Sequence, residues 1–336
     1  MTYVISGRNI NDLYPQALHF VNRDGVVDTS RAGDVKVVPF PVLTVTDKPM
    51  ERVLFDQTRD ANPFFHLFEC LWMLNGDSDA RWLDRFVGDF SARFAEESGH
   101  IHGAYGKRWR EWFDHDQLIL AVDRLKADPK DRRLVISMWD PYNDPQDLDE
   151  VPLKDVPCNT HMYPRIVNGK LDLTVCVRSN DVIWGAYGAN AVHMTFVQEY
   201  LAGLIGVPVG KFYQLSNNWH AYTEVLDRFM NSDDLVHSSS SNLYVTGRVV
   251  AEPIMTKPEF WDLDLEKFMD NPDRPDFDNM WFYLVARPAW NAHVAYKEKR
   301  WEDAFEWCSL VDASDWSLAM QSWIARRYQK WVAKNA

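Results

Sequence analysis

One cysteine of the chain, Cys158, has the surroundings of a nucleophile. It follows a segment rich in proline and aspartate, residues 140–154, and it precedes a run that alternates between apolar and polar residues and ends at Arg178. A thiolate held near a fixed guanidinium is nucleophilic near neutral pH. Cys158 is therefore a candidate nucleophile, although the local pattern alone leaves open that it is a small packed apolar residue.

A second candidate for chemistry is Glu69, in the middle of an apolar segment. This segment, residues 63–77, begins with proline and ends near Gly76, which is typical of a helix. A buried carboxylate is costly unless it is paired or protonated, and such groups concentrate at functional sites. The alternative is that Glu69 faces a narrow strip of solvent. The remaining cysteines are interpreted as packing residues: Cys70 in an apolar helix, Cys176 in the middle of a strand and Cys308 in a Trp-rich helix.

Arginines are the candidates for binding a phosphate. The net charge of −13 disfavours nucleic-acid binding, so a phosphate on a small ligand would need a local cluster of arginines. The candidates are Arg31, Arg132, Arg133 and Arg178. Taken one by one, each could equally be a solvated surface charge.

The elements that must position these residues mix helices with strands. Asn168-Gly169 predicts a two-residue hairpin turn, followed by a strand with Leu171, Leu173, Val175 and Val177 on one face. Other strands are predicted at 35–38, 42–45, 133–138 and 210–215, and helices at 11–21, 63–77, 78–97, 116–126, 191–205, 292–310 and 315–332.

Length and composition bound the class of protein. At 336 residues and 46% hydrophobic content the chain can bury a substantial core. Charged residues interrupt each apolar run, the N-terminus lacks a leader pattern, and four cysteines without a CxxC pair fit a reducing compartment. We expect a soluble cytoplasmic protein without a metal, without a membrane segment and without direct contact to nucleic acid.

Six motifs together resemble the thymidylate synthase family, which includes the pyrimidine nucleotide hydroxymethylases. They occur in the family's order between about residues 31 and 222. The motifs are residues 69–77, 105–110, 132–137, 157–158, 178–181 with Gly185 and Asn190, and 220–222.

The resemblance implies a fold and a reaction. The fold is α+β, a large mixed sheet covered by helices, with a homodimer formed through the sheet's other face. Cys158 would add to C6 of a pyrimidine nucleotide monophosphate, and Glu69, through water, and Tyr105 would manage the proton transfers. The co-substrate would be 5,10-methylenetetrahydrofolate.

The resemblance also assigns binding residues. Arg178, Ser179 and Arg31 would hold the phosphate, whereas Arg132 and Arg133 would reach into the partner's site of an obligate homodimer. His220 and Tyr222 would bind the sugar, and Asn190 would bind the edge of the base. The folate would be bound by Trp72, Asp181 and Gly185.

Asn190 bears on the choice of base. Its carboxamide can donate to O4 and accept from N3–H, which complements uracil, whereas an Asp is expected there in relatives that take cytosine nucleotides. The sequence therefore favours dUMP.

Three departures from the synthases bear on the product. Asn159 replaces the histidine that follows the nucleophile of the synthases. The run from Gly185 to Asn190 is one residue longer than theirs and lacks their phenylalanine. The sequence ends with residues 331–336 instead of with the apolar tail that closes the synthase site. Weaker closure over the folate would admit water.

We therefore predict hydroxymethylation of dUMP, which would suit a virus that modifies its DNA. Thymidylate synthesis is the second alternative and a cytosine-nucleotide hydroxymethylase the third; an inactive, nucleotide-binding relative belongs to another class. Residues 1–250 are predicted to form the catalytic domain and residues 251–336 a Trp-rich helical elaboration packed on it.

Overall fold

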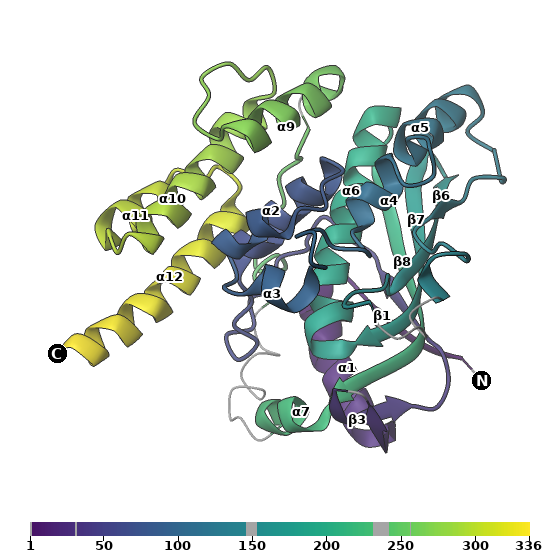
Figure 1. Ribbon diagram of the computed structural model, residues 1–336, viewed down its shortest axis with the longest axis horizontal. Coiled ribbons are helices and arrows are strands. Elements are labelled where there is room, and N and C mark those ends of the chain that lie inside the picture. Colours follow the sequence, from purple (N-terminus) through teal and green to yellow (C-terminus); the bar gives the residue numbers. More distant parts are fainter. Residues whose placement is uncertain (1, 31, 146–152, 231–241, 256) are drawn as a thin grey trace.

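A single mixed sheet organises the chain (Figure 1). The computed structural model describes residues 2–30, 32–145, 153–230, 242–255 and 257–336. The strands are β1 (Tyr3–Gly7), β2 (Val26–Ser30), β3 (Gly33–Val38), β4 (Val42–Thr46), β5 (Ile136–Ser137), β6 (Asn159–Val167), β7 (Lys170–Asp181) and β8 (Val209–Tyr222). Their order is β1-β4-β8-β7-β6-β5, and β3 pairs with both β2 and the end of β8. Because β7 runs parallel to β8 but antiparallel to β6, the sheet is mixed, as predicted.

The β6–β7 hairpin places Cys158, the candidate nucleophile, at one end of the sheet. Asn168 and Gly169 adopt positive φ angles of 51° and 74°, which the favoured two-residue turn requires. The predicted alternation along β7 is confirmed, since one row of its side chains is fully buried: Leu171, Leu173, Val175 and Val177. The hairpin therefore has one core face, which fixes its register.

Helices stack in layers on that core face (Figure 1). They are α1 (Ile10–Asp24), α2 (Pro63–Leu74), α3 (Phe90–Phe94), α4 (Tyr105–Arg110), α5 (Gln117–Ala127), α6 (Asn190–Ile205), α7 (Thr223–Met230), α9 (Trp261–Asp270), α10 (Arg287–Lys297), α11 (Trp301–Ser309) and α12 (Ser314–Asn335). Helix α6 packs on β7 and β8, α2 packs on α6, and α10 and α12 pack on α2. None of the helices in the described ranges is both long enough and apolar enough to cross a membrane.

Helix α2 forms as its sequence predicts. The side chain of Asn62 accepts hydrogen bonds from the backbone N–H groups of Phe64 and Phe65, and Pro63 occupies the first turn. The helix ends before Gly76, whose φ of 76° terminates it. Nearly every residue of α2 is buried, whereas Glu69 keeps partial exposure.

Three predicted elements are wrong in extent. The helix expected over 78–97 is a 3-10 turn at Ala80–Arg85 and the short α3, because Asp89 adopts a left-handed φ of 60° between them. The helix expected over 292–310 is divided into α10 and α11, with Lys299 at a φ of 61°. The strand expected over 133–138 is reduced to β5.

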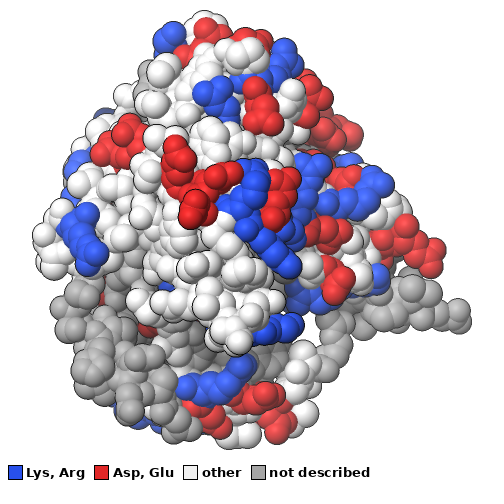
Figure 2. All heavy atoms as spheres, turned by 90° about the vertical axis from the view of Figure 1, so that its left-hand side faces the viewer, with Lys and Arg blue, Asp and Glu red and all other residues white. Residues whose placement is uncertain are grey.

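The C-terminal helices share the core of the rest of the chain. The ring of Phe64 on α2 lies 5.2 Å from the ring of His293 and 5.7 Å from that of Trp323, centroid to centroid. Asp60 binds Arg326 at 2.9 Å and also pairs with Arg327. In the view of Figure 2, acidic and basic side chains are intermixed among uncharged residues, without a large area of one sign. The division into a catalytic domain, residues 1–250, and a C-terminal elaboration, residues 251–336, stays a prediction.

Candidate active site

Arg178 fixes the loop that carries Cys158. The backbone N–H of Arg178 donates to the carbonyl of Cys158 at 2.9 Å. Its guanidinium donates from Nε to the carbonyl of Pro157 and from Nη2 to that of Val156, both at 2.8 Å. The strand end therefore holds the cysteine loop in place, with the guanidinium next to it.

Tyr105 meets the same loop from the other side. This first residue of α4 accepts hydrogen bonds at its phenolic oxygen from the backbone N–H of Cys158 at 3.2 Å and of Asn159 at 3.1 Å. Because the oxygen accepts both bonds, its hydroxyl hydrogen is left to donate to another group. Burial raises the pKa of Tyr105, so the phenol stays protonated at neutral pH.

The thiol is surrounded by competing electrostatic influences. Burial raises the pKa of Cys158, Arg178 opposes that shift, and the carboxyl of Asp155 reinforces it. Burial also raises the pKa of Asp155 to about 6, although Arg178 acts in the opposite direction. The positive charge expected from the sequence is present, but in the isolated chain it does not overcome desolvation.

Helices α2 and α6 bring Glu69 next to a histidine that the sequence analysis did not single out. The Nε2 atom of His193 lies 2.9 Å from Oε2 of Glu69. Both atoms are buried, and within the described residues neither has a correctly aligned hydrogen bond. His193 is three residues after Asn190, and this helical spacing was the signal available in the sequence, since it places both side chains on one face.

A chain of amides holds Asn190. Its Nδ2 donates to Oδ1 of Asn180 at 3.0 Å, and its Oδ1 accepts from Nδ2 of Asn159, also at 3.0 Å. Asn180 in turn donates to Gln214 at 2.8 Å and to Ser216 at 2.9 Å. In this network Asn190 retains one amide hydrogen and one oxygen lone pair for a ligand.

The longer run before Asn190 forms a π-helix, Val182–Ala189. A π-turn holds one more residue than an α-turn, so this conformation can accommodate the extra residue. Asp181 caps this helix through Oδ1, which accepts from the backbone N–H of Ile183 at 2.9 Å and of Trp184. Its Oδ2 is buried without a hydrogen-bond partner in the described ranges. A Cβ on Gly185 would come within 2.9 Å of the Asn180 side chain, so a larger residue would disturb the amide chain.

Both predicted sugar residues and one predicted phosphate residue line a single cavity. Ser179, His220 and Tyr222 line a cavity of about 310 Å³ beside the loop between β2 and β3. His220 and Asp181 are register partners across β8 and β7, and burial lowers the pKa of the imidazole while raising that of the carboxyl. Arg31 lies outside the described residues, but its neighbours Ser30 and Ala32 line this cavity.

Three predicted site residues stand apart from the cluster. Arg132 and Arg133 are exposed in the segment before β5, where Arg133 pairs with Asp131 at 3.3 Å. Trp72 is only 2% exposed and donates its indole N–H to the carbonyl of Asp79 at 3.1 Å. A folate contact by Trp72 would require the packing around α2 to open.

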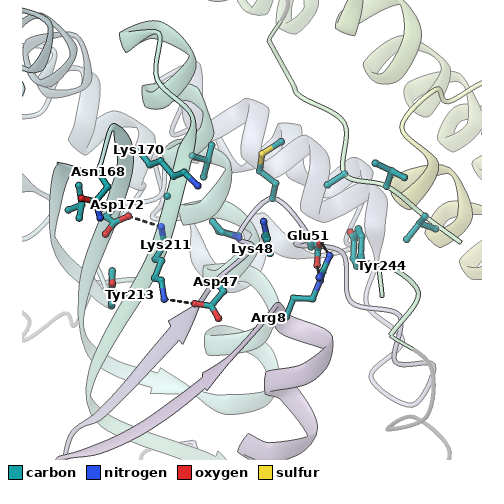
Figure 3. A pocket seen from close by; sticks show the side chains of 18 of the residues that line it. Arg8, Asp47, Lys48, Glu51, Asn168, Lys170, Asp172, Lys211, Tyr213 and Tyr244 are labelled. Atoms are coloured by element: carbon teal, nitrogen blue, oxygen red, sulfur yellow. Dashed lines mark hydrogen bonds and ion pairs between the residues drawn. The ribbon is translucent and has the colours of Figure 1, made fainter. Parts of the chain in front are cut away.

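Another cavity, of about 680 Å³, lies at the opposite end of β7 and β8 (Figure 3). Its charged groups largely pair with one another. Lys211 binds Asp47 at 2.7 Å, and Arg8 binds Glu51 at 2.6 Å. Cys158 and its surrounding polar groups lie at the other end of these strands, which is therefore the end that holds the candidate site.

Comparison with known proteins agrees with this geometry. The family model for thymidylate synthase matches residues 17–272, and the chain belongs to the thymidylate synthase family. A deoxyuridylate hydroxymethyltransferase of Pseudomonas phage M6 is 42% identical over 99% of this chain and 97% of its own. A protein of the same name from Bacillus phage SP01 is 34% identical over 66% of this chain and 59% of its own.

The crystal structure of thymidylate synthase from T4 phage resembles the fold. It superposes with a TM-score of 0.52 over 64% of this chain and 78% of the synthase, at 22% sequence identity. The predicted architecture, a large mixed sheet covered by helices, is therefore confirmed.

Proposed function

We propose that this protein is a deoxyuridylate hydroxymethyltransferase, which converts dUMP to 5-hydroxymethyl-dUMP. The observation that carries the proposal is the convergence of Cys158, Tyr105, Glu69 and the amide chain at Asn190 at one end of the sheet. The near full-length similarity to a phage protein of that name favours uracil as the base and hydroxymethyl as the added group.

Cys158 starts the reaction by adding its sulfur to C6 of uracil, which makes C5 nucleophilic. Charge then develops on the ring oxygen O4, and the amide hydrogen that Asn190 does not donate to Asn180 can stabilise it. Asn190 Oδ1 accepts from N3–H. A cytosine presents the reverse donor pattern, so the amide chain as built favours dUMP.

Glu69 and Tyr105 then handle protons. The carboxylate accepts the C5 proton, through water, while the phenol donates its free hydroxyl hydrogen within the site. Arg178, Ser179 and Arg31 hold the 5′-phosphate, and His220 and Tyr222 bind the sugar hydroxyl from the wall of the neighbouring cavity. A cavity of this kind orients the nucleotide before the sulfur attacks.

Methylenetetrahydrofolate, when bound, supplies the one-carbon unit. The structure offers a group that fits it, since the buried and unpartnered Oδ2 of Asp181 can accept a hydrogen bond from a pterin N–H. Trp184 lies near this position with an exposed ring, and the guanidinium of Arg59 stacks on it at 4.1 Å. Gly185, the third predicted folate residue, has no side chain to crowd the neighbouring amides of Asn180 and Asn190.

The enzyme acts as a homodimer through the face of the sheet opposite α6. That face carries large apolar side chains that are partly exposed in the single chain, including Tyr163 on β6 and Leu215 on β8. Arg132 and Arg133 reach into the partner's site, where their charge would favour both the phosphate and the Cys158 thiolate.

The direct test is a reaction of the purified protein with dUMP and methylenetetrahydrofolate, following product mass and dihydrofolate absorbance together. We expect a hydroxymethyl product without dihydrofolate. A methyl product with an equal amount of dihydrofolate would instead identify a thymidylate synthase.

A further inference from the structure

A histidine lies against the carboxylate that the proposed reaction uses. His193 on α6 is 3% exposed, and its Nε2 is 2.9 Å from Oε2 of Glu69 on α2. Within the described residues neither atom has another hydrogen-bond partner. Two buried polar atoms at this distance are costly unless they pair, so a small rotation of the ring that aligns the bond is favoured.

We propose that His193 is a positioning residue, which holds the Glu69 carboxylate toward the pyrimidine for its proton transfers. This inference rests on the proposed function. Once the bond is aligned, the imidazole would hold Oε2 and leave Oε1 of Glu69 for water. Catalytic hydrogen bonds that are poorly aligned in a free enzyme tighten when substrate is bound, which fits the geometry seen here.

The step that most needs this carboxylate is the addition of water. With Cys158 bound to C6 and a methylene group on C5, the water oxygen forms a bond to the methylene carbon, and the water proton passes to Glu69. The C5–methylene double-bond electrons move onto the ring as an enolate. Their return forms the C5–C6 double bond and expels the Cys158 thiolate, and Glu69 releases its proton to solvent.

Other titratable groups surround the pair without replacing the contact. The ring of His66, also on α2, lies 6.2 Å from that of His193, and burial lowers its pKa well below the usual value. Arg59 lowers the pKa of His66 further, and Glu69 itself raises the pKa of Asp155. His66 therefore stays neutral and offers a matched control, a second buried histidine on the helix that carries Glu69.

The test compares His193→Phe, which removes the ring nitrogens, with His193→Gln, which keeps an N–H donor near the position of Nε2. The control is His66→Gln. Release of tritium from C5-labelled dUMP and product formation are measured with the dUMP dissociation constant and thermal unfolding. We expect His193→Phe to slow both rates by about 10- to 100-fold while dUMP binding changes by less than about threefold. His193→Gln should recover most of the rate, and His66→Gln should behave as wild type.

Several results would overturn the inference. These are a His193→Phe rate within about threefold of wild type, equal losses in His193→Phe and His193→Gln, or an equal loss in the control. If His193→Phe does not fold, His193→Gln is compared with His193→Ser, since only the Gln side chain is long enough to donate to Glu69. A faster rate in His193→Gln supports the inference, and equal rates overturn it. A methyl product from the wild-type enzyme would contradict the proposed function alone, because tritium release still reports whether His193 serves Glu69.

Discussion

The phenolic oxygen of Tyr105 accepts a hydrogen bond from the backbone N–H of Cys158 at 3.2 Å. This bond ties the start of α4 to the loop that carries the nucleophile, and the second bond, from Asn159, fixes the angle of the ring. Tyr105 therefore helps to fix the geometry of the cysteine, in addition to the proton transfer that we propose for it.

Replacing Tyr105 with Phe should affect both roles. Two backbone N–H groups would lose their acceptor, and an unsatisfied buried donor costs about 1–3 kcal/mol. We expect the free energy of unfolding to fall by roughly that amount and the rate constant kcat to fall by about 100-fold. Denaturant unfolding and steady-state kinetics measure the two effects. Unchanged stability would show that the two bonds contribute little, and unchanged kcat would exclude the phenol from proton transfer.

The reactivity of the thiol should respond in opposite directions to its two charged neighbours. Asp155 raises the pKa of Cys158, so Asp155→Asn should increase the fraction of thiolate. Arg178 lowers that pKa, so Arg178→Gln should decrease the fraction. Rates of alkylation by iodoacetamide at pH 7.5, an assay condition, should change by about threefold in each direction. The buried Cys70 serves as an internal reference in peptide mapping. Changes of the same sign in both variants would contradict this electrostatic account.

Asn190→Asp should weaken the preference for uracil. The new carboxylate can still accept from Asn159, but it loses the donor bond to Asn180 and faces the oxygen of that amide. We expect kcat/KM for dUMP to fall by at least about 100-fold, because a buried hydrogen-bonding group is left unmatched. Activity toward dCMP should rise relative to dUMP. Competition assays with both nucleotides measure the ratio, and an unchanged ratio would remove Asn190 from base recognition.

Stability should depend on pH through Asp315, at the start of α12. Burial raises its pKa to about 6, although the hydroxyl of Tyr244 donates to it at 2.8 Å. A carboxyl with a raised pKa binds more protons in the folded state, so its ionisation destabilises the fold as the pH rises from about 4 to about 6. This ionisation lowers the free energy of unfolding by up to roughly 3 kcal/mol, and Asp315→Asn should abolish that decrease. Thermal unfolding at pH 5 and pH 7, two assay conditions, measures the difference in both proteins. An equal pH dependence would show that Asp315 is not the source.

The local motifs of the fold could be predicted from sequence where one physical signal dominated. The β6–β7 hairpin followed from Asn168-Gly169 and strict alternation, and α2 followed from its proline start and apolar residues. The failures were left-handed residues that interrupt helical patterns, Asp89 and Lys299, because neither residue type requires that conformation.

The candidate site was only partly predictable for a related reason. Residue types and order were enough to propose Cys158, Tyr105 and Glu69 as candidates. The contact between Glu69 and His193, in contrast, depends on how α2 and α6 pack against each other. Trp72 looked available as part of a motif, but its neighbours bury it almost completely. Tertiary packing therefore determines which motif residues face a ligand.

The central claim is that water, and not hydride, completes the reaction at the methylene group. The most direct measurement is the reaction in water enriched in oxygen-18, with the mass of the nucleotide product determined and Cys158→Ser as the inactive control. We predict a hydroxymethyl product that carries the heavy oxygen and depends on Cys158. An unlabelled methyl product, formed together with dihydrofolate, would contradict the account.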